Sequence, residues 1–227
     1  MSEEIIDHKN TYFNIINGEF RTRVTEDTEG AIAREYETKD GAKAVKWERP
    51  VSALKGVVTD IYFREGEYGK SVMIMLDENS DGQTPVIQLG VSSNYGEDFL
   101  KKLPNMKLDN EVMLRPYAFE ENSKEKRGIA VTQCDEEGNF TVKCYDYFIE
   151  MKEVEGKNVY TQLHGYPTPE KSNKEMDKED WKIYFIQTRK FLVNYAEENI
   201  LNKFTKETPK KKIDYPENEV DGEDSPF

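Results

Sequence analysis

The sequence predicts a mainly β protein whose central β-barrel is followed by one long helix. Two observations predict this class. Short alternating apolar segments separated by turn residues run from residue 51 to residue 145. A single stretch with helical periodicity then spans 177–204. We therefore expect four parts: a β extension packed on the barrel (1–50), the barrel (51–150), a C-terminal extension with the long helix (151–205) and a disordered tail (206–227).

The N-terminal part is predicted to begin with a β-hairpin. Residues 12–16 are apolar and aromatic, and residues 19–25 form the polar return strand. Asn17 and Gly18 lie between them, and Asn-Gly is a strong signal for a two-residue turn because both residues accept positive φ. Short strands with polar turns are expected up to residue 49.

The central part is predicted to contain three strands, a short helix and two or three further strands. This is the order of an OB barrel, whose helix lies between its third and fourth strands. Gly56 inside the first strand predicts a bulge or a sharp bend, and 120–127 is expected to form a charged loop. A generic antiparallel sandwich is the alternative. We expect strands at 51–63, 71–76, 85–91, 111–119, 128–133 and 140–145, and the short helix at 94–103.

The long helix at 177–204 has a recognisable start. Asp177 suits the N-cap and Asp180 the first turn. Aromatic and aliphatic residues from Trp181 to Phe204 recur at three- and four-residue spacing, which is typical of a helix with one packed face. We expect it to pack on the barrel, and a dimer or partner helix is the alternative.

The composition argues against an enzyme and against a metal site. The chain has two cysteines, Cys134 and Cys144, and two histidines, His8 and His164, with no Cys-x-x-Cys motif or Cys/His cluster. No catalytic triad or nucleophile motif is present. We therefore expect no catalytic residues, no metal and no cofactor. No apolar run is long enough to cross a membrane, and no signal peptide is found, so a cytoplasmic location is expected.

The charge is strongly acidic and unevenly distributed. The net charge is −13, and 214–227 contains six acidic residues and no Lys or Arg. Without that segment the chain still carries −7. Nucleic-acid binding by such a protein requires a local basic stripe.

The last seven residues suit a docking tail. A terminal Phe can enter an apolar pocket of a partner while its carboxylate meets a basic residue, and the neighbouring acids steer the encounter. Bacterial single-stranded DNA-binding proteins end in an acidic tip that closes with Asp-Ile-Pro-Phe, and this chain ends Glu-Asp-Ser-Pro-Phe. The tail thus resembles theirs, and the whole chain looks like a divergent phage type. The tail residues expected to bind a partner are Asp221, Glu223, Asp224, Pro226 and Phe227.

This resemblance implies a function in replication, recombination or repair in a bacterial host cell. The tail is expected to recruit proteins such as polymerase, helicase or primase, and to compete with DNA for a basic groove. The barrel is expected to bind single-stranded DNA through cations and aromatic rings, since every base offers a stacking face. The residues expected to bind DNA are Lys46, Trp47, Arg49, Tyr62, Arg64, Tyr68, Lys70, Arg115, Tyr117, Phe119, Lys126 and Arg127.

Two other functions fit parts of the same sequence. An acidic DNA mimic that inhibits a host enzyme is favoured by the net charge of −13. It predicts acids spread over the folded body and no DNA binding. A virion or structural protein would use the barrel for protein contacts and would assemble without DNA. The sequence leaves a homo-oligomer open.

Overall fold

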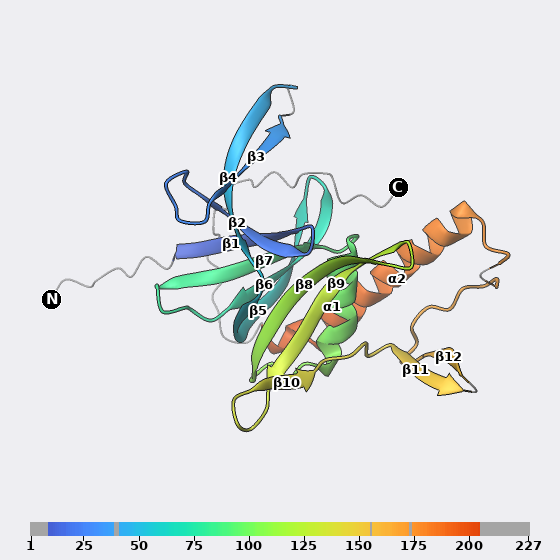
Figure 1. The fold of residues 1–227 in the computed structure, drawn as a ribbon. Helices are drawn as coiled ribbons and strands as arrows, with labels where there is room; N and C mark the ends of the chain where they lie inside the picture. Colours follow the sequence, from blue (N-terminus) through green and yellow to red (C-terminus); the bar gives the residue numbers. More distant parts are fainter. Residues whose placement is uncertain (1–8, 39–40, 155, 173, 205–227) are drawn as a thin grey trace.

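The computed structural model describes residues 9–38, 41–154, 156–172 and 174–204 (Figure 1). Within these ranges the chain forms one ten-stranded mixed sheet, a separate two-stranded hairpin and two α-helices. The sheet order is β10-β9-β8-β5-β6-β7-β1-β2-β4-β3. The predicted mainly β class with a long C-terminal helix is confirmed.

The N-terminal strands form one end of this sheet. β1 (Lys9–Ile16) and β2 (Glu19–Val24) are the predicted hairpin, and Asn17 and Gly18 have φ of 49° and 79° as the turn requires. β4 (Lys43–Val51) lies between β2 and β3 (Ile32–Glu37), antiparallel to both. In Figure 1 β3 and the beginning of β4 extend away from the rest of the molecule.

The central elements follow the predicted order. β5 pairs antiparallel with both β6 and β8, β7 follows β6, and β9 pairs with β8. The central elements are β5 (Leu54–Gly66), β6 (Gly69–Leu76), β7 (Gln83–Gly90), α1 (Asn94–Lys102), a 3₁₀ turn (Leu103–Asn105), β8 (Glu111–Glu121), β9 (Lys124–Cys134) and β10 (Phe140–Lys143).

Two local features in this region differ from the prediction in position or form. The register shift in β5 lies between Val58 and Asp60, two residues beyond Gly56. Gly56 instead leaves room for the Asp77 carboxylate, whose Oδ1 accepts a hydrogen bond of 2.8 Å from the amide of Val57. The expected loop at 120–127 is a tight β8–β9 hairpin, because Asn122 and Ser123 adopt φ of 52° and 58° and let the strands pair up to the turn.

The far edge of β7 pairs with β1, in parallel, from Lys9 opposite Gln83 to Phe13 opposite Ile87. Among the described strands no ladder joins β7 to β9. Helix α1 lies against β9 instead, where Asp98 Oδ2 accepts from the amide of Ile129 at 2.8 Å and Lys102 Nζ donates to the Ile129 carbonyl at 2.7 Å. Side chains of a helix thus satisfy backbone groups of β9 that no strand pairs.

One core joins the N-terminal hairpin to the central strands. Phe13 of β1 and Phe20 of β2 are buried in the same cluster as Phe99 of α1, Leu114 of β8 and Leu192 of α2. The turn between β1 and β2 also touches β8, because a Cβ added at Gly18 would overlap the backbone of Tyr117 and Ala118. The N-terminal strands are therefore anchored at two places on the central body.

The C-terminal part contains a hairpin that the sequence does not predict, β11 (Ile149–Val154) with β12 (Lys157–Gln162). Helix α2 (Lys178–Asn199) starts as predicted, with Asp177 and Asp180 forming a reciprocal capping box, and a 3₁₀ turn (Leu201–Lys203) follows. Its C-terminal half is buried through Leu192, Val193 and Ala196. In the described part of the chain, neither helix combines the length and apolar character needed to cross a membrane.

Candidate functional site

A groove of about 2440 Å³ opens between three parts of the molecule that are distant in sequence. Its lining comes from strands β1 to β4, from the β5–β6 hairpin and the loop before α1, and from the N-terminal half of α2. The groove therefore depends on elements that lie before and after the central strands as much as on those strands.

The groove is basic although the chain is acidic. Among the residues that the structure describes, eleven Lys or Arg line it against five Glu, while the whole chain has a net charge of −13. The acids of this protein thus lie mostly elsewhere, and the groove concentrates positive charge where a polyanion could enter. The basic lining residues are Lys9, Arg21, Arg23, Arg34, Lys46, Arg49, Arg64, Arg127, Lys178, Lys182 and Arg189.

Strands β2, β4 and β3 place four of these cations on one face. Arg34 is paired directly with Lys46, Arg23 with Glu48, and Arg21 with Pro50. Directly opposed residues of antiparallel strands point to the same face, and residues two apart on one strand share it. Arg21, Arg23, Arg34 and Lys46 therefore line the same face of this three-stranded segment.

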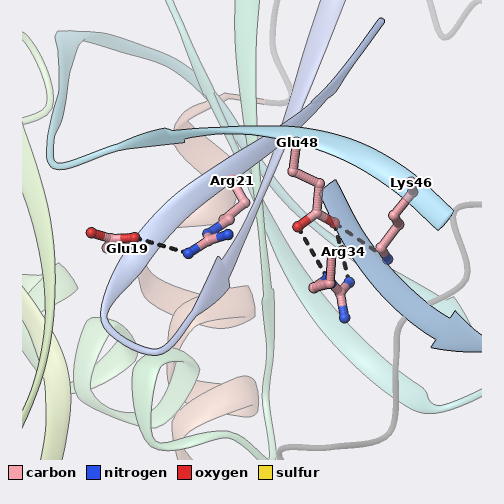
Figure 2. Close-up of polar contacts among 5 residues, drawn as sticks. All are labelled: Glu19, Arg21, Arg34, Lys46 and Glu48. Carbon is pink, nitrogen blue, oxygen red and sulfur yellow. Dashed lines mark hydrogen bonds and ion pairs between the residues drawn. The ribbon is translucent and has the colours of Figure 1, made fainter. Parts of the chain in front are cut away.

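One buried acid lies among these cations. Glu48 is 6% exposed, and its carboxylate accepts two hydrogen bonds of 3.1 Å from Nε and Nη2 of Arg34. Nζ of Lys46 lies 3.4 Å from its Oε1. Figure 2 shows both cations pointing at this carboxylate, with Arg21 beside them and bonded to Glu19 at 3.1 Å. The bidentate geometry fixes the plane of the Arg34 guanidinium.

Helix α2 contributes aromatic rings next to cations. The rings of Trp181 and Phe185 stack with centroids 5.7 Å apart, and the guanidinium of Arg189 lies 5.9 Å from the Phe185 ring centre. Phe185 is 40% exposed. Lys178 and Lys182 lie on the same stretch of helix. Stacked rings beside cations are the combination that bases and phosphates require.

The β5–β6 hairpin contributes an exposed ring to the groove, and α1 contributes a paired acid. Tyr68 is at the tip of the β5–β6 hairpin and is exposed, close in sequence to Arg64. Glu97 of α1 is held by Lys101 Nζ at 2.6 Å. Burial opposes the charge on Lys101, but Glu97 and the Tyr166 hydroxyl outweigh it and raise the pKa of Lys101. Lys101 stays protonated, so its positive charge offsets the negative charge of Glu97 in the groove lining.

Five of the twelve residues predicted to bind DNA line this groove: Lys46, Arg49, Arg64, Tyr68 and Arg127. The others lie outside it. Lys70 is 3.6 Å from Glu197 and 5.4 Å from the Phe63 ring centre, and Lys126 forms an ion pair with Glu121. The predicted residues that do not line the groove are Trp47, Tyr62, Lys70, Arg115, Tyr117, Phe119 and Lys126.

Three of the residues predicted to bind DNA, Arg115, Tyr117 and Phe119, lie on one face of β8. Arg115 and Phe119 are exposed and alternate with buried Val112 and Leu114. The Tyr117 ring is 5.7 Å from that of Phe119. Burial, with Asp98 and Tyr95 nearby, raises the pKa of Tyr117. The Tyr117 ring packs over Gly128, where a Cβ would overlap the tyrosine hydroxyl. Part of this face of β8 is therefore used for packing within the protein.

Seven groove cations are not among the residues predicted from sequence. Arg21 and Arg23 alternate with Thr22 and Val24, and the same alternation places Arg34 and Tyr36 together, so strand periodicity could have marked this face. The α2 cations are not identifiable in that way, because only the packing of α2 places them in the lining of the same groove. The seven cations are Lys9, Arg21, Arg23, Arg34, Lys178, Lys182 and Arg189.

Two further predictions, on the C-terminal tail and on metal binding, do not concern the groove. The tail residues Asp221, Glu223, Asp224, Pro226 and Phe227 lie outside the described residues. Over the described ranges, no group of three or more His, Cys, Asp or Glu converges as a metal site would require. No family model, curated protein or solved structure matches this chain.

Proposed function

We propose that this protein binds single-stranded DNA, with little sequence preference, in the basic groove. The observation that carries the proposal is the charge contrast between groove and chain. In the described part of the chain, eleven cations line the groove against five acids, in a protein of net charge −13. Phosphate neutralisation with counterion release supplies most of the affinity of sequence-independent binding, and this groove is suited to it.

The aromatic lining favours a single strand over a duplex. Tyr12, Tyr36, Tyr68, Trp181 and Phe185 line the groove, and a ring can stack only on a base that is not already stacked in a duplex. Each stacked base contributes about 1–3 kcal/mol without sequence preference. The groove thus offers both the electrostatic and the stacking part of such an interface.

The strand connections support an OB-like origin for the central body. The order β5-β6-β7-α1-β8-β9, with β5 between β6 and β8, follows that of OB barrels. Tyr68 lies in the hairpin between the first two of these strands, a loop with which OB folds bind ligands. The parallel partner of β7 is here β1 rather than β9.

The acidic tail would recruit replication, recombination or repair proteins while the groove holds DNA. This part of the proposal, with a phage origin and a bacterial cytoplasm as its setting, rests on the terminal sequence Glu-Asp-Ser-Pro-Phe. A Phe-ended, acidic segment docks on basic, apolar pockets of partners.

The direct test is a fluorescence titration of the full chain with oligo-dT at low salt, repeated at rising salt. We expect binding whose logarithm falls linearly with the logarithm of salt concentration. Lys182→Gln should weaken binding and reduce the magnitude of this slope by about 0.7, because one phosphate is no longer neutralised by the protein. Lys190→Gln is the matched control, since Lys190 is exposed on the same helix but does not line the groove.

Absence of oligo-dT binding at low salt would overturn the proposal and would favour the alternative function, an acidic DNA mimic that inhibits a host enzyme. If Lys182→Gln and Lys190→Gln change the affinity and the salt slope equally, the protein binds DNA but not in this groove. A stable assembly formed without DNA, together with no binding, would favour a structural protein.

A further inference from the structure

Glu48 is an acid in a surface that otherwise attracts anions. Its carboxylate is 6% exposed and lines the groove. Arg23 is directly opposite on β2, and Arg34 and Lys46 hold the carboxylate from β3 and β4. A negative charge here lowers the attraction of the groove for phosphate, so its presence needs another explanation.

The geometry around Glu48 restricts the two cations that it holds. Nε and Nη2 of Arg34 bond separate oxygens of one carboxylate, each at 3.1 Å, so the guanidinium has one plane and one direction. Lys46 Nζ is 3.4 Å from Oε1. Long side chains on exposed strands lose conformational entropy when they bind a ligand. Holding them in place before binding removes much of that cost.

We propose that Glu48 positions Arg34 and Lys46 as a preformed phosphodiester subsite at the β3–β4 end of the groove. The inference rests on the proposed function and deepens it, since it assigns a residue of the wrong charge to the binding of DNA. Arg34 and Lys46 contact the phosphates, and Glu48 acts through them without touching DNA.

For Glu48→Gln, the proposal predicts a change in DNA affinity opposite to the change that simple electrostatics predicts. Removing a negative charge from a basic groove should strengthen the binding of a polyanion. If Glu48 positions the two cations, the amide of Gln presents a donor to the Arg34 donors, and the bidentate pair is broken. We expect affinity for oligo-dT to fall about fivefold, equivalent to roughly 1 kcal/mol at 1.4 kcal/mol per tenfold.

Glu179→Gln is the matched control. Glu179 also lines the groove, but its side chain is 74% exposed and its nearest cation, Lys182 Nζ, is 4.0 Å away. This variant loses the same charge without releasing a bidentate pair. We expect its affinity to rise slightly, as simple electrostatics predicts, and its salt slope to equal that of the wild type.

The salt slope is the readout that a purely structural role would leave unchanged. Glu48→Gln should reduce its magnitude by about 0.7 for each phosphate that is no longer neutralised, and thus by about 1.4 if both cations are displaced. In an Arg34→Gln/Lys46→Gln background, Glu48→Gln should no longer weaken binding, because the residues through which it acts are gone.

A second variant keeps the test independent of folding. Glu48→Asp retains the charge, but its shorter side chain cannot hold both cations from the same backbone position. Positioning predicts weaker binding by Glu48→Asp, whereas a simple charge effect predicts wild-type affinity. Thermal unfolding of each variant confirms that folded protein is compared.

The outcomes separate the inference from the function on which it rests. If wild-type protein fails to bind oligo-dT, the proposed function fails first. If wild type binds and both Glu48 variants bind as tightly with the same slope, only the positioning role is overturned. Equal weakening by Glu48→Gln in the wild-type and double-substituted backgrounds would also overturn it.

Discussion

The central body and the elements that flank it differ in how they carry charge. Only Arg64 and Arg127 of the eleven groove cations come from the body formed by β5–β9 and α1. The other nine come from β1–β4 and α2. The central body thus supplies the frame, and the flanking elements supply most of the candidate interface.

Burial explains this division. Most residues of β6 and β7 are buried, on both faces of the sheet, and such strands have no place for unpaired charges. No residue of β3 is buried, and β4 buries only Glu48. Exposed strands can exchange charged residues at little cost to stability, so an interface forms more readily there.

The largest effect is expected from removing three exposed cations of the N-terminal strands. A Lys9→Gln/Arg23→Gln/Arg49→Gln variant should bind oligo-dT on the order of 100-fold more weakly at low salt, and its salt slope should fall by about 2, as three phosphate contacts require. The measurement is the same fluorescence titration over a range of salt concentrations.

The matched control removes three exposed lysines from the body and from β10, as Lys55→Gln/Lys124→Gln/Lys143→Gln. These side chains lie outside the groove, and the net charge changes equally. We expect less than about a threefold decrease in affinity, because charges outside an interface act on DNA only through a salt-screened field. Equal decreases in the two triple variants would mean that overall charge, and not the flanking strands, governs binding.

The next prediction concerns the free energy of unfolding and tests how the N-terminal strands are attached to the central body. Gly18→Ala should destabilise the fold by about 2–4 kcal/mol, because its φ of 79° is strained for alanine and its Cβ would meet the backbone of β8. Gly138→Ala has the same strain, with φ of 84°, but open space around the Cβ. It should cost about 1–2 kcal/mol.

Denaturant unfolding of both glycine variants measures the difference. The excess destabilisation in Gly18→Ala reports the packing of the β1–β2 turn against β8. If the two variants are destabilised equally, within a few tenths of a kcal/mol, the N-terminal hairpin is held by the β1–β7 ladder and the shared core alone.

The sequence predicts the body well for a physical reason. Local turn residues and strand alternation decide where β5–β9 begin and end, and Asp177 with Asp180 decides where α2 begins. The far edge of β7 pairs with β1 and not with β9. This pairing depends on contacts between segments distant in sequence, and no local sequence pattern predicts it. The strands of the β11–β12 hairpin are almost entirely exposed, and the apolar–polar alternation of β11 ends after Lys152. Such a short alternation does not identify a strand, so this hairpin escapes prediction.

The site is harder to predict because it is assembled by tertiary packing. Closeness to Trp47 in sequence marks Lys46 and Arg49 as candidates, although Trp47 itself does not line the groove. The spacing of the α2 aromatic residues predicts one packed stripe, yet Phe185 and Ile186 are exposed and line the groove. Periodicity shows that a helix has an apolar face, but not how far along the helix that face is covered.

The smallest effect is expected for Phe119, and it sharpens the contrast between body and flank. Phe119 on β8 and Phe185 on α2 are exposed to 50% and 40%, but only Phe185 lines the groove. Phe185→Ala should weaken oligo-dT binding by about 1–3 kcal/mol, the value of one stacked base. Phe119→Ala should change it by less than about twofold, since truncating an exposed ring outside the interface removes no stacking partner. Titration of both variants with oligo-dT tests this. A comparable loss of affinity in Phe119→Ala would mean that DNA also contacts the exposed face of β8, and that the central body forms part of the interface.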